Sequence, residues 1–169
     1  MTIRKIYFDM DGVLADFSQG VRELCGMEPT PLNGKRDAQY DDLMWTEIAK
    51  VEHFYLELKQ MPGAKSLFDT VYKGFKDRCE ILTAIPNPKR NIVNAERDRI
   101  EWVKRNLSER VKVNVVQRTE KPKFCTGEDC VLIDDMQKNT RIWQELGGTG
   151  ILFIDADQTL ATIDDMSFQ

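Results

Sequence analysis

The sequence lacks any apolar run that approaches the roughly 20 residues of a membrane-spanning helix, and its first residues lack the apolar stretch of a signal peptide. It also has no excess of basic residues: 24 lysines and arginines stand against 28 aspartates and glutamates, a formal net charge of −4. Proteins that bind nucleic-acid polymers need a basic face that displaces counterions. We therefore expect a cytoplasmic protein that binds neither a membrane nor a nucleic-acid polymer.

Histidine and cysteine are scarce as well. His53 is the single histidine, so a serine or cysteine nucleophile has no other histidine available as its base. The 4 cysteines fit free thiols in a reducing compartment. Cys125 and Cys130 are close enough in sequence for a metal pair, but no second pair completes the four ligands that zinc usually takes. We expect two reduced thiols in a surface loop there.

Five short apolar segments have the composition of strands that are buried on both faces. They are residues 3–8, 79–82, 111–116, 131–133 and 151–154. Helical periodicity separates them, with clear apolar stripes along residues 64–75 and 100–107 and a shorter one that ends at Gly147-Gly148. Strands that alternate with helices predict an α/β fold with an open, Rossmann-like parallel sheet wrapped by helices.

One interval between predicted strands is unusually long. About seventy residues separate the first strand from the second, far more than an ordinary crossover needs. Most of this interval has helical character, and the helix from Ala64 is expected to return to the core. We interpret residues 17–63 as a small helical cap inserted after the first strand, and residues 1–16 with 64–169 as the α/β core. The tail from Asp155 is polar and short of signals.

Three aspartates, Asp9, Asp11 and Asp16, follow the first predicted strand closely. Asp9 and Asp11 can converge on one point where the strand turns into a loop, and Gly12 permits a sharp turn. Like charges this close raise a carboxyl pKa unless a cation compensates them. Mg²⁺ is the natural cation, because it prefers oxygen ligands from one or two carboxylates, phosphate and water.

The other candidate residues follow the other predicted strands. Thr83 follows the second strand, Lys121 follows the third, and Asp134 with Asp135 closes the fourth. The carboxyl ends of parallel strands meet at one edge of a sheet, so we expect these side chains to converge on Asp9. Carboxylates, a hydroxyl and an ammonium group are what phosphoryl transfer through an aspartyl phosphate requires.

Two simpler interpretations of these residues stay open. Lys123 lies two positions from Lys121 and could be the phosphate-binding lysine instead. Asp134 and Asp135 could cap the helix that is expected from Met136, a role that is compatible with metal binding because a helix N-terminus also favours anions.

The four motifs, in this order, resemble those of the haloacid dehalogenase-like (HAD) phosphohydrolases. Within that superfamily, the stretches DMDGVLADF, FYLELKQMPGAKSLF, ILTAIP, EWVKRNL and VLIDD resemble the 5'(3')-deoxyribonucleotidases. The resemblance implies a phosphoric monoester hydrolase that uses Mg²⁺ and acts on a small molecule, a deoxynucleoside monophosphate, as a monomer or a homodimer. The base, the sugar and the choice between 5' and 3' phosphate do not follow from it.

The resemblance also implies a role for each catalytic position. Asp9 is the nucleophile, and Asp11 is the general acid and base that protonates the leaving oxygen. Thr83, Ala84 and Lys121 bind the phosphate.

It further implies the metal ligands and the contacts of the substrate. The expected Mg²⁺ ligands are Asp9, the carbonyl of Asp11, and Asp135. Asp134 is either a further ligand or lies behind the ligands without contacting the ion. Three aromatic residues are expected to face the substrate: Phe17, Phe54 and Tyr55.

The chain departs from the family after the second strand, where Ala84-Ile85-Pro86 stands in place of the usual Ser-Pro. One hydroxyl near the phosphate or sugar is therefore absent. This keeps open a phosphatase for another small ester, such as a sugar phosphate, or a phosphotransferase. A phospho-receiver domain, which needs an aspartate after the third strand, is a remote alternative, because this chain has Gln117-Arg118 there. A non-catalytic phosphate-binding relative is a second remote alternative.

Overall fold

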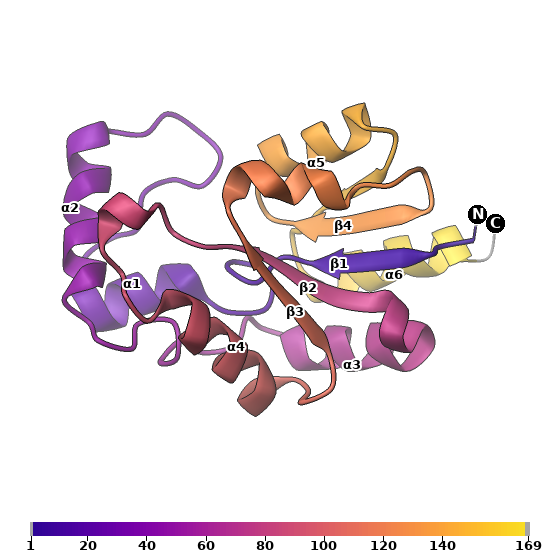
Figure 1. Ribbon diagram of the computed structural model, residues 1–169, viewed down its shortest axis with the longest axis horizontal. Helices are drawn as coiled ribbons and strands as arrows, with labels where there is room; N and C mark the ends of the chain where they lie inside the picture. The colour runs from indigo at the N-terminus through magenta and orange to yellow at the C-terminus, as the bar shows by residue number, and fades with distance from the viewer. Residues whose placement is uncertain (1, 168–169) are drawn as a thin grey trace.

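In the computed structural model, which describes residues 2–167, five parallel strands form one sheet with helices on both faces (Figure 1). The strands are β1 (Lys5–Phe8), β2 (Cys79–Ala84), β3 (Lys112–Val116), β4 (Cys130–Asp134) and β5 (Thr149–Leu152). Their order across the sheet is β3-β2-β1-β4-β5. The predicted α/β fold with an open parallel sheet is confirmed.

The fifth strand deviates most from its prediction, since it covers Thr149–Leu152 and not residues 151–154. Thr149 and Gly150 are not apolar, so they carry no strand signal of the kind that marks the other four. Gly150 lies against the backbone of Thr140, where a side chain would meet the carbonyl oxygen at 2.5 Å. The strand packs closely on the helix that contains Thr140, which explains why a glycine, with no apolar side chain, occupies position 150 of this strand.

The described residues also form six α-helices and three short 3₁₀ helices. The α-helices are α1 (Phe17–Cys25), α2 (Ala38–Ala49), α3 (Ala64–Phe75), α4 (Ala95–Asn106), α5 (Gln137–Glu145) and α6 (Ala156–Ser167). The 3₁₀ helices are η1 (Lys76–Arg78), η2 (Pro88–Arg90) and η3 (Arg118–Phe124). No helix within residues 2–167 is both long and apolar enough to cross a membrane.

Helix α6 lies in the polar tail, where the sequence carries few signals. Asp155 accepts a 2.8 Å hydrogen bond from the backbone N–H of Gln158 and so satisfies a donor in the first turn. Ile163, with 3% of its surface exposed, packs into the core from this helix. Only Ala156, Thr159 and Ile163 are buried among the residues of this helix whose burial is described, and three positions give too short an apolar stripe for the pattern to identify.

Two apolar clusters hold the helices to the sheet. On one face, side chains of β1, β2 and β4 pack with those of α3, α4 and α6, and the rings of Phe8 and Phe68 lie 6.0 Å apart. On the other face, Tyr7 and Leu132 pack against Trp143 of α5. The sheet is thus buried on both faces, as the apolar composition of its strands requires.

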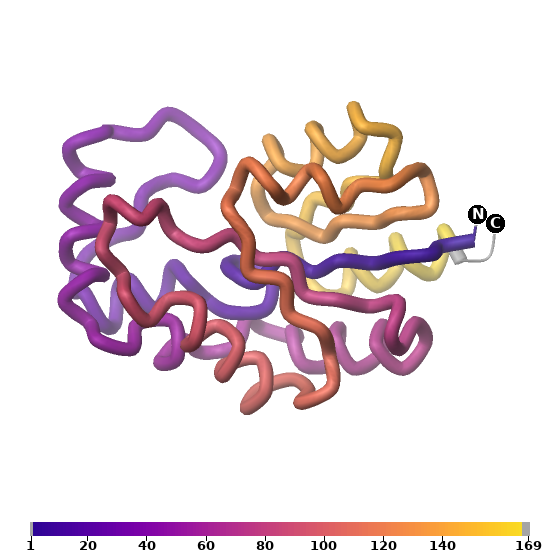
Figure 2. The backbone as a smooth tube through the Cα atoms, viewed as in Figure 1, coloured from indigo at the N-terminus to yellow at the C-terminus, as the bar shows by residue number. Residues whose placement is uncertain are grey.

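The segment between β1 and β2 lies beyond the carboxyl ends of the strands. There α1 and α2 pack against each other, and α3 then runs back along the sheet (Figure 1). The trace in Figure 2 shows that β1 and α6 have their outer ends together at the opposite edge of the molecule. The carboxyl ends of the strands therefore face helices α1 and α2.

Candidate active site

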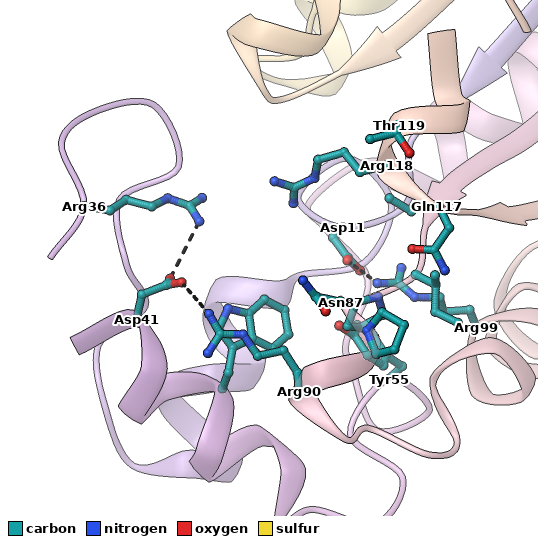
Figure 3. Close-up of a pocket in the computed structure, with 15 residues that line it drawn as sticks. Asp11, Arg36, Asp41, Tyr55, Asn87, Arg90, Arg99, Gln117, Arg118 and Thr119 are labelled. Carbon is teal, nitrogen blue, oxygen red and sulfur yellow. Dashed lines mark hydrogen bonds and ion pairs between the residues drawn. The ribbon is translucent and has the colours of Figure 1, made fainter. Parts of the chain in front are cut away.

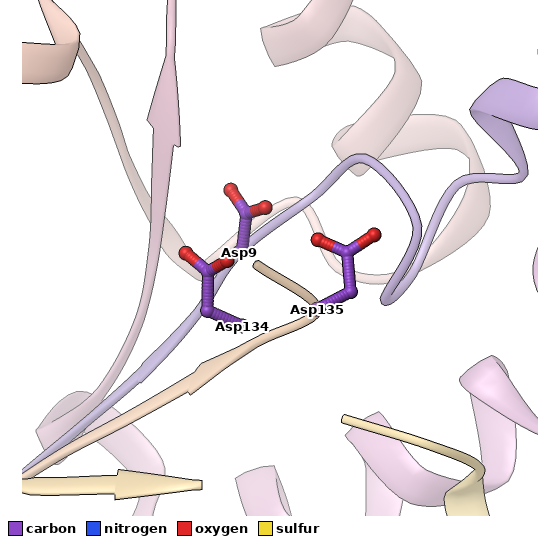
Figure 4. A group of neighbouring side chains, drawn as sticks. All are labelled: Asp9, Asp134 and Asp135. Carbon is purple, nitrogen blue, oxygen red and sulfur yellow. The ribbon is translucent and has the colours of Figure 1, made fainter. Parts of the chain in front are cut away.

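Three aspartates gather at the carboxyl edge of the sheet (Figure 4). Asp9, Asp134 and Asp135 each offer a carboxylate oxygen, and these three oxygens lie within 4.8 Å of one another. The backbone N–H of Asp9 donates a 2.9 Å hydrogen bond to the carbonyl of Ile133, which joins the ends of β1 and β4. Asp9 and Asp134 are buried. Carboxylates that are this close together and this buried stay ionised only with positive charge nearby.

Lys121 supplies one such charge. Its Nζ donates hydrogen bonds to Oδ1 of Asp9 at 2.8 Å and to Oδ2 of Asp134 at 2.7 Å. Only 5% of its side chain is exposed, whereas 74% of the Lys123 side chain is exposed and its acidic partner is Glu120 at 3.9 Å. The structure therefore brings Lys121, and not Lys123, to the acidic group.

Asp134 has both carboxylate oxygens engaged by protein donors. Besides Lys121, Oδ2 accepts a 3.0 Å hydrogen bond from Nδ2 of Asn139, and Oδ1 accepts one of 2.8 Å from the N–H of Met136. The N-cap of α5 is Met136, with no side-chain cap, so neither aspartate occupies that position. Asp134 is thus placed to hold Lys121, and Asp135 is the acid of this pair that remains available to a cation.

Gly12 makes room for Asp135. Its φ of +77° lies in the left-handed region, and a Cβ at this position would overlap Oδ2 of Asp135. The carbonyl of Asp135 accepts a 2.8 Å hydrogen bond from Nδ2 of Asn33, whose Oδ1 accepts one of 3.0 Å from the N–H of Gln137. The loop that precedes α2 is therefore tied directly to the acidic edge of the sheet.

Burial and mutual repulsion raise the pKa values of these acids, and a bound cation would counter both effects. Burial raises the pKa of Asp135 to about 9, and the charges of Asp9, Asp134 and Asp11 add to the effect. Burial also raises the pKa of Asp9 to about 7; Lys121 lowers it, and Asp134 and Asp11 raise it. The three carboxylates offer oxygen ligands close to one another, and oxygen is the ligand type that Mg²⁺ prefers.

Arg99 of α4 is a buried site residue that the sequence analysis did not identify. Its Nη2 donates to Oδ2 of Asp11 at 2.7 Å, and its Nη1 donates to Oγ1 of Thr83 at 2.7 Å. The guanidinium carbon lies 3.9 Å from the ring centroid of Tyr55. A signal was present: Arg99 is three positions before Trp102, on the buried face of α4.

Asp11 adjoins this arginine, and 27% of its side chain is exposed. Arg99 engages Oδ2, while Oδ1 is buried and has no hydrogen-bond partner among the described residues. Thr83 is 1% exposed and lines neither of the two cavities described below, so its hydroxyl faces Arg99. The structure therefore places Asp11 in the site, with Thr83 behind it and Arg99 joining the two.

A cleft in two parts adjoins these residues. The inner part, of about 120 Å³, is lined by Asp9, Asp135 and Lys121, and the outer part, of about 380 Å³, opens beside Asp11 (Figure 3). Both parts are lined by Asp11, Arg36, Trp45, Ala84 and Arg118, so they adjoin each other.

The three aromatic residues expected to face a substrate occupy different places. Phe17 lines the inner part of the cleft and Tyr55 lines the outer part. Phe54 lines neither; it is 1% exposed and packs edge-on against Phe17 and Tyr55, with ring centroids 5.6 and 5.3 Å away. The structure thus brings two of the three to the cleft and places Phe54 behind them.

Comparisons with known proteins give a fold and no closer sequence relationship. No protein-family model matches the chain, and no curated protein matches it in sequence. Among solved structures, a hydrolase from Streptococcus pneumoniae TIGR4 has a TM-score of 0.56 at 13% identity, over 97% of this chain and 100% of that one. A HAD-superfamily hydrolase from Ehrlichia chaffeensis has a TM-score of 0.53 at 13% identity, over 100% of both chains. At these identities the comparison shows that the chain has the fold of HAD-superfamily hydrolases.

Proposed function

We propose that this chain is a Mg²⁺-dependent phosphatase of the HAD superfamily that releases phosphate from small monoesters. The observation that carries the proposal is the position of Asp9, at the end of β1, with Lys121 at 2.8 Å and two further aspartates within reach of a shared cation. The fold shared with HAD-superfamily hydrolases supports the same class of reaction.

Asp9 is the nucleophile of the proposed reaction. Lys121 engages its Oδ1, which leaves Oδ2 to attack phosphorus. The bond from phosphorus to the leaving oxygen then breaks, and Asp11 donates a proton to that oxygen. In the second half, Asp11 takes a proton from a water molecule that attacks the aspartyl phosphate, which releases phosphate and restores the carboxylate of Asp9.

The remaining charged residues hold the phosphoryl group and orient the acids. Lys121 neutralises charge on the phosphoryl oxygens, and Ala84 lines both parts of the cleft, where it can contact them. Asp9, Asp135 and the carbonyl of Asp11 would hold Mg²⁺, which when bound compensates the carboxylates and the phosphate. Asp134 fixes Lys121 and does not need to contact the ion.

The proposed substrate is a nucleoside monophosphate, with a deoxynucleotide as the first choice. The motif resemblance to deoxyribonucleotidases supports this choice, and so do Trp45 and Tyr55, which can offer ring surface to a base or sugar in the outer part of the cleft. In this proposal residues 17–63 act as a cap that excludes bulk water. The alternative is another small ester such as a sugar phosphate, since the hydroxyl usual after Thr83 is absent.

A phosphate-release assay tests the class of reaction. Purified protein with Mg²⁺ should release phosphate from p-nitrophenyl phosphate and from at least one nucleoside or sugar monophosphate, and EDTA should stop it. A ranking of deoxynucleotides, ribonucleotides and sugar phosphates by kcat/KM would then choose between the two substrate classes. No release from any of these esters with Mg²⁺ present would disprove the proposal.

A further inference from the structure

The outer part of the cleft is rich in arginine. Its lining includes four guanidinium groups, from Arg36, Arg90, Arg99 and Arg118, against the two carboxylates of Asp11 and Asp41. A pocket that had only to accept an uncharged sugar or base would not need this charge. Guanidinium groups are the side chains best suited to bind carboxylate and phosphate, through paired hydrogen bonds.

The arginines differ in how much of their charge is already compensated. Arg99 pairs with Asp11, whereas Arg36 and Arg90 share Asp41 at 3.7 and 3.5 Å. Arg90 also contacts Asp42 at 2.5 Å. These pairs leave the pocket lining with a surplus of positive charge.

Arg118 contributes an uncompensated charge to that surplus. Its side chain makes no hydrogen bond or ion pair with any residue among 2–167, and its guanidinium extends toward that of Arg36 across the pocket (Figure 3). The two come from different parts of the chain: Arg36 from the loop before α2, and Arg118 from the start of η3. An anion placed between them would be held by both parts.

The position of Asp11 shows which part of a substrate reaches this pocket. Asp9 and Lys121 line only the inner part of the cleft, and Asp11 lines both parts. If Asp11 protonates the leaving oxygen, the transferred phosphate lies in the inner part and the leaving group extends into the outer part. A volume of about 380 Å³ is enough for a small polar leaving group.

We infer that the leaving group of the substrate carries an anionic group of its own, a carboxylate or a second phosphate, which binds Arg118 together with Arg36 and Arg90. This inference rests on the proposed phosphatase function, but it replaces the first-choice substrate of that proposal, a nucleoside monophosphate, with phosphate monoesters of anionic alcohols. A nucleoside bisphosphate or a phosphorylated hydroxy acid has this chemistry, whereas a simple nucleoside monophosphate has an uncharged leaving group.

Binding of phosphonates, which cannot be hydrolysed, tests the inference without turnover. Phosphonoacetate, 3-phosphonopropionate and 4-phosphonobutyrate are each compared with the alkylphosphonate of the same chain length, by calorimetry in the presence of Mg²⁺. At least one carboxylated member should bind about tenfold or more tighter than its alkyl partner, as expected for a charge-assisted pair. A parallel series of alkyl bisphosphonates shows whether a second phosphate is preferred to a carboxylate.

Substitutions show which residues cause the preference for a carboxylated ligand. Arg118→Gln should reduce the affinity ratio between carboxylated and alkyl ligands about tenfold. Arg110→Gln, an equal loss of charge at an exposed residue just before β3, should leave that ratio unchanged. Arg36→Gln should reduce the ratio in the same direction as Arg118→Gln.

The outcomes separate this inference from the proposed function. Equal affinities within every pair, or a ratio that Arg118→Gln does not alter, would overturn the second-anion inference even if phosphate esters are hydrolysed. A clear preference for anionic ligands without phosphate release from any ester would instead remove the phosphatase proposal and leave an anion-binding pocket.

Discussion

Nη2 of Arg99 donates a 2.7 Å hydrogen bond to Oδ2 of Asp11, although the two residues are 88 positions apart in the chain. The same guanidinium donates to Thr83, so it fixes the proposed acid relative to the end of β2. We infer that Arg99 is a positioning residue for Asp11.

Arg99→Lys should therefore lower kcat at least tenfold for alkyl phosphates, because a single ammonium cannot make both hydrogen bonds. The loss should be smaller for p-nitrophenyl phosphate, whose leaving oxygen needs little protonation. Steady-state kinetics on both substrates measure the difference, and a melting temperature shows whether the variant is folded. Equal losses on the two substrates would contradict a role through Asp11.

Lys121 and Lys123 form a matched pair for mutation. Lys121→Met leaves Asp9 and Asp134 buried without their shared cation, and we expect a loss of about 3 kcal/mol of unfolding free energy together with all activity. Lys123→Met removes an exposed ammonium and should change stability by less than about 0.5 kcal/mol. Urea denaturation measures both. Similar behaviour of the two variants would show that the buried lysine does not have this role.

A comparison of Gly12→Ala with Gly26→Ala distinguishes the effect of backbone strain from the effect of a steric clash. Both have a left-handed φ, of +77° and +66°, but a Cβ would overlap Asp135 at Gly12 and has nothing within 4 Å at Gly26. Each substitution to alanine should cost about 1 kcal/mol of stability from its backbone conformation. Only Gly12→Ala should also displace Asp135 and weaken Mg²⁺ binding, measured by calorimetry, by tenfold or more. Unchanged Mg²⁺ affinity in Gly12→Ala would argue against Asp135 as a ligand.

The raised pKa values of Asp9 and Asp135 predict how pH affects stability. Their ordinary value is 3.8, and the folded values are about 7 and about 9. Between these limits the folded protein binds more protons than the unfolded chain, so without metal its free energy of unfolding falls as pH rises from about 4 to 9. The slope should be on the order of 1 kcal/mol per pH unit.

Mg²⁺ should oppose this fall, because it competes with protons for the same carboxylates. The increase in melting temperature on adding Mg²⁺ should thus be larger at pH 8 than at pH 5, and Asp135→Asn should reduce it at pH 8. Scanning calorimetry at the two pH values measures the effect. A Mg²⁺-induced increase that does not depend on pH would mean that the ion binds elsewhere.

Asp9→Asn tests the nucleophile. An amide cannot form the aspartyl phosphate, so phosphate release should stop, while the fold is kept because the change removes a buried charge and no packing contact. Circular dichroism and the phosphate-release assay check the two halves of this expectation. Turnover at the normal rate in a folded Asp9→Asn protein would place the nucleophile at another residue.

The sequence predicts most of the sheet and the place of the acids because both depend on local pattern. Continuous apolar segments identify strands buried on both faces, and residues that follow parallel strands must share an edge. Asp9 and Asp135 meet for this topological reason, although 126 positions separate them.

Other features depend on contacts that no local pattern encodes. Arginine is a residue type usually found on the exposed face of a helix. Arg99 is buried because Asp11, Thr83 and Tyr55, which are distant in sequence, surround it in the fold. Besides Arg99, the arginines of the outer part of the cleft come from separate segments: Arg36 from the loop before α2, Arg90 from η2 and Arg118 from η3. Their convergence depends on how those segments fold. Helix α6 was missed because the packing of a few side chains, such as Ile163, decides its position.

The outer ends of β1 and α6 lie together, at the edge of the sheet away from the acids (Figure 2). A dye, an affinity handle or a carrier protein joined at either side of that edge would thus stand a full strand length from the cleft. Immobilised or fluorescent forms of the protein should keep an unobstructed entrance for ligands, so the binding and kinetic measurements described above can be made on them directly.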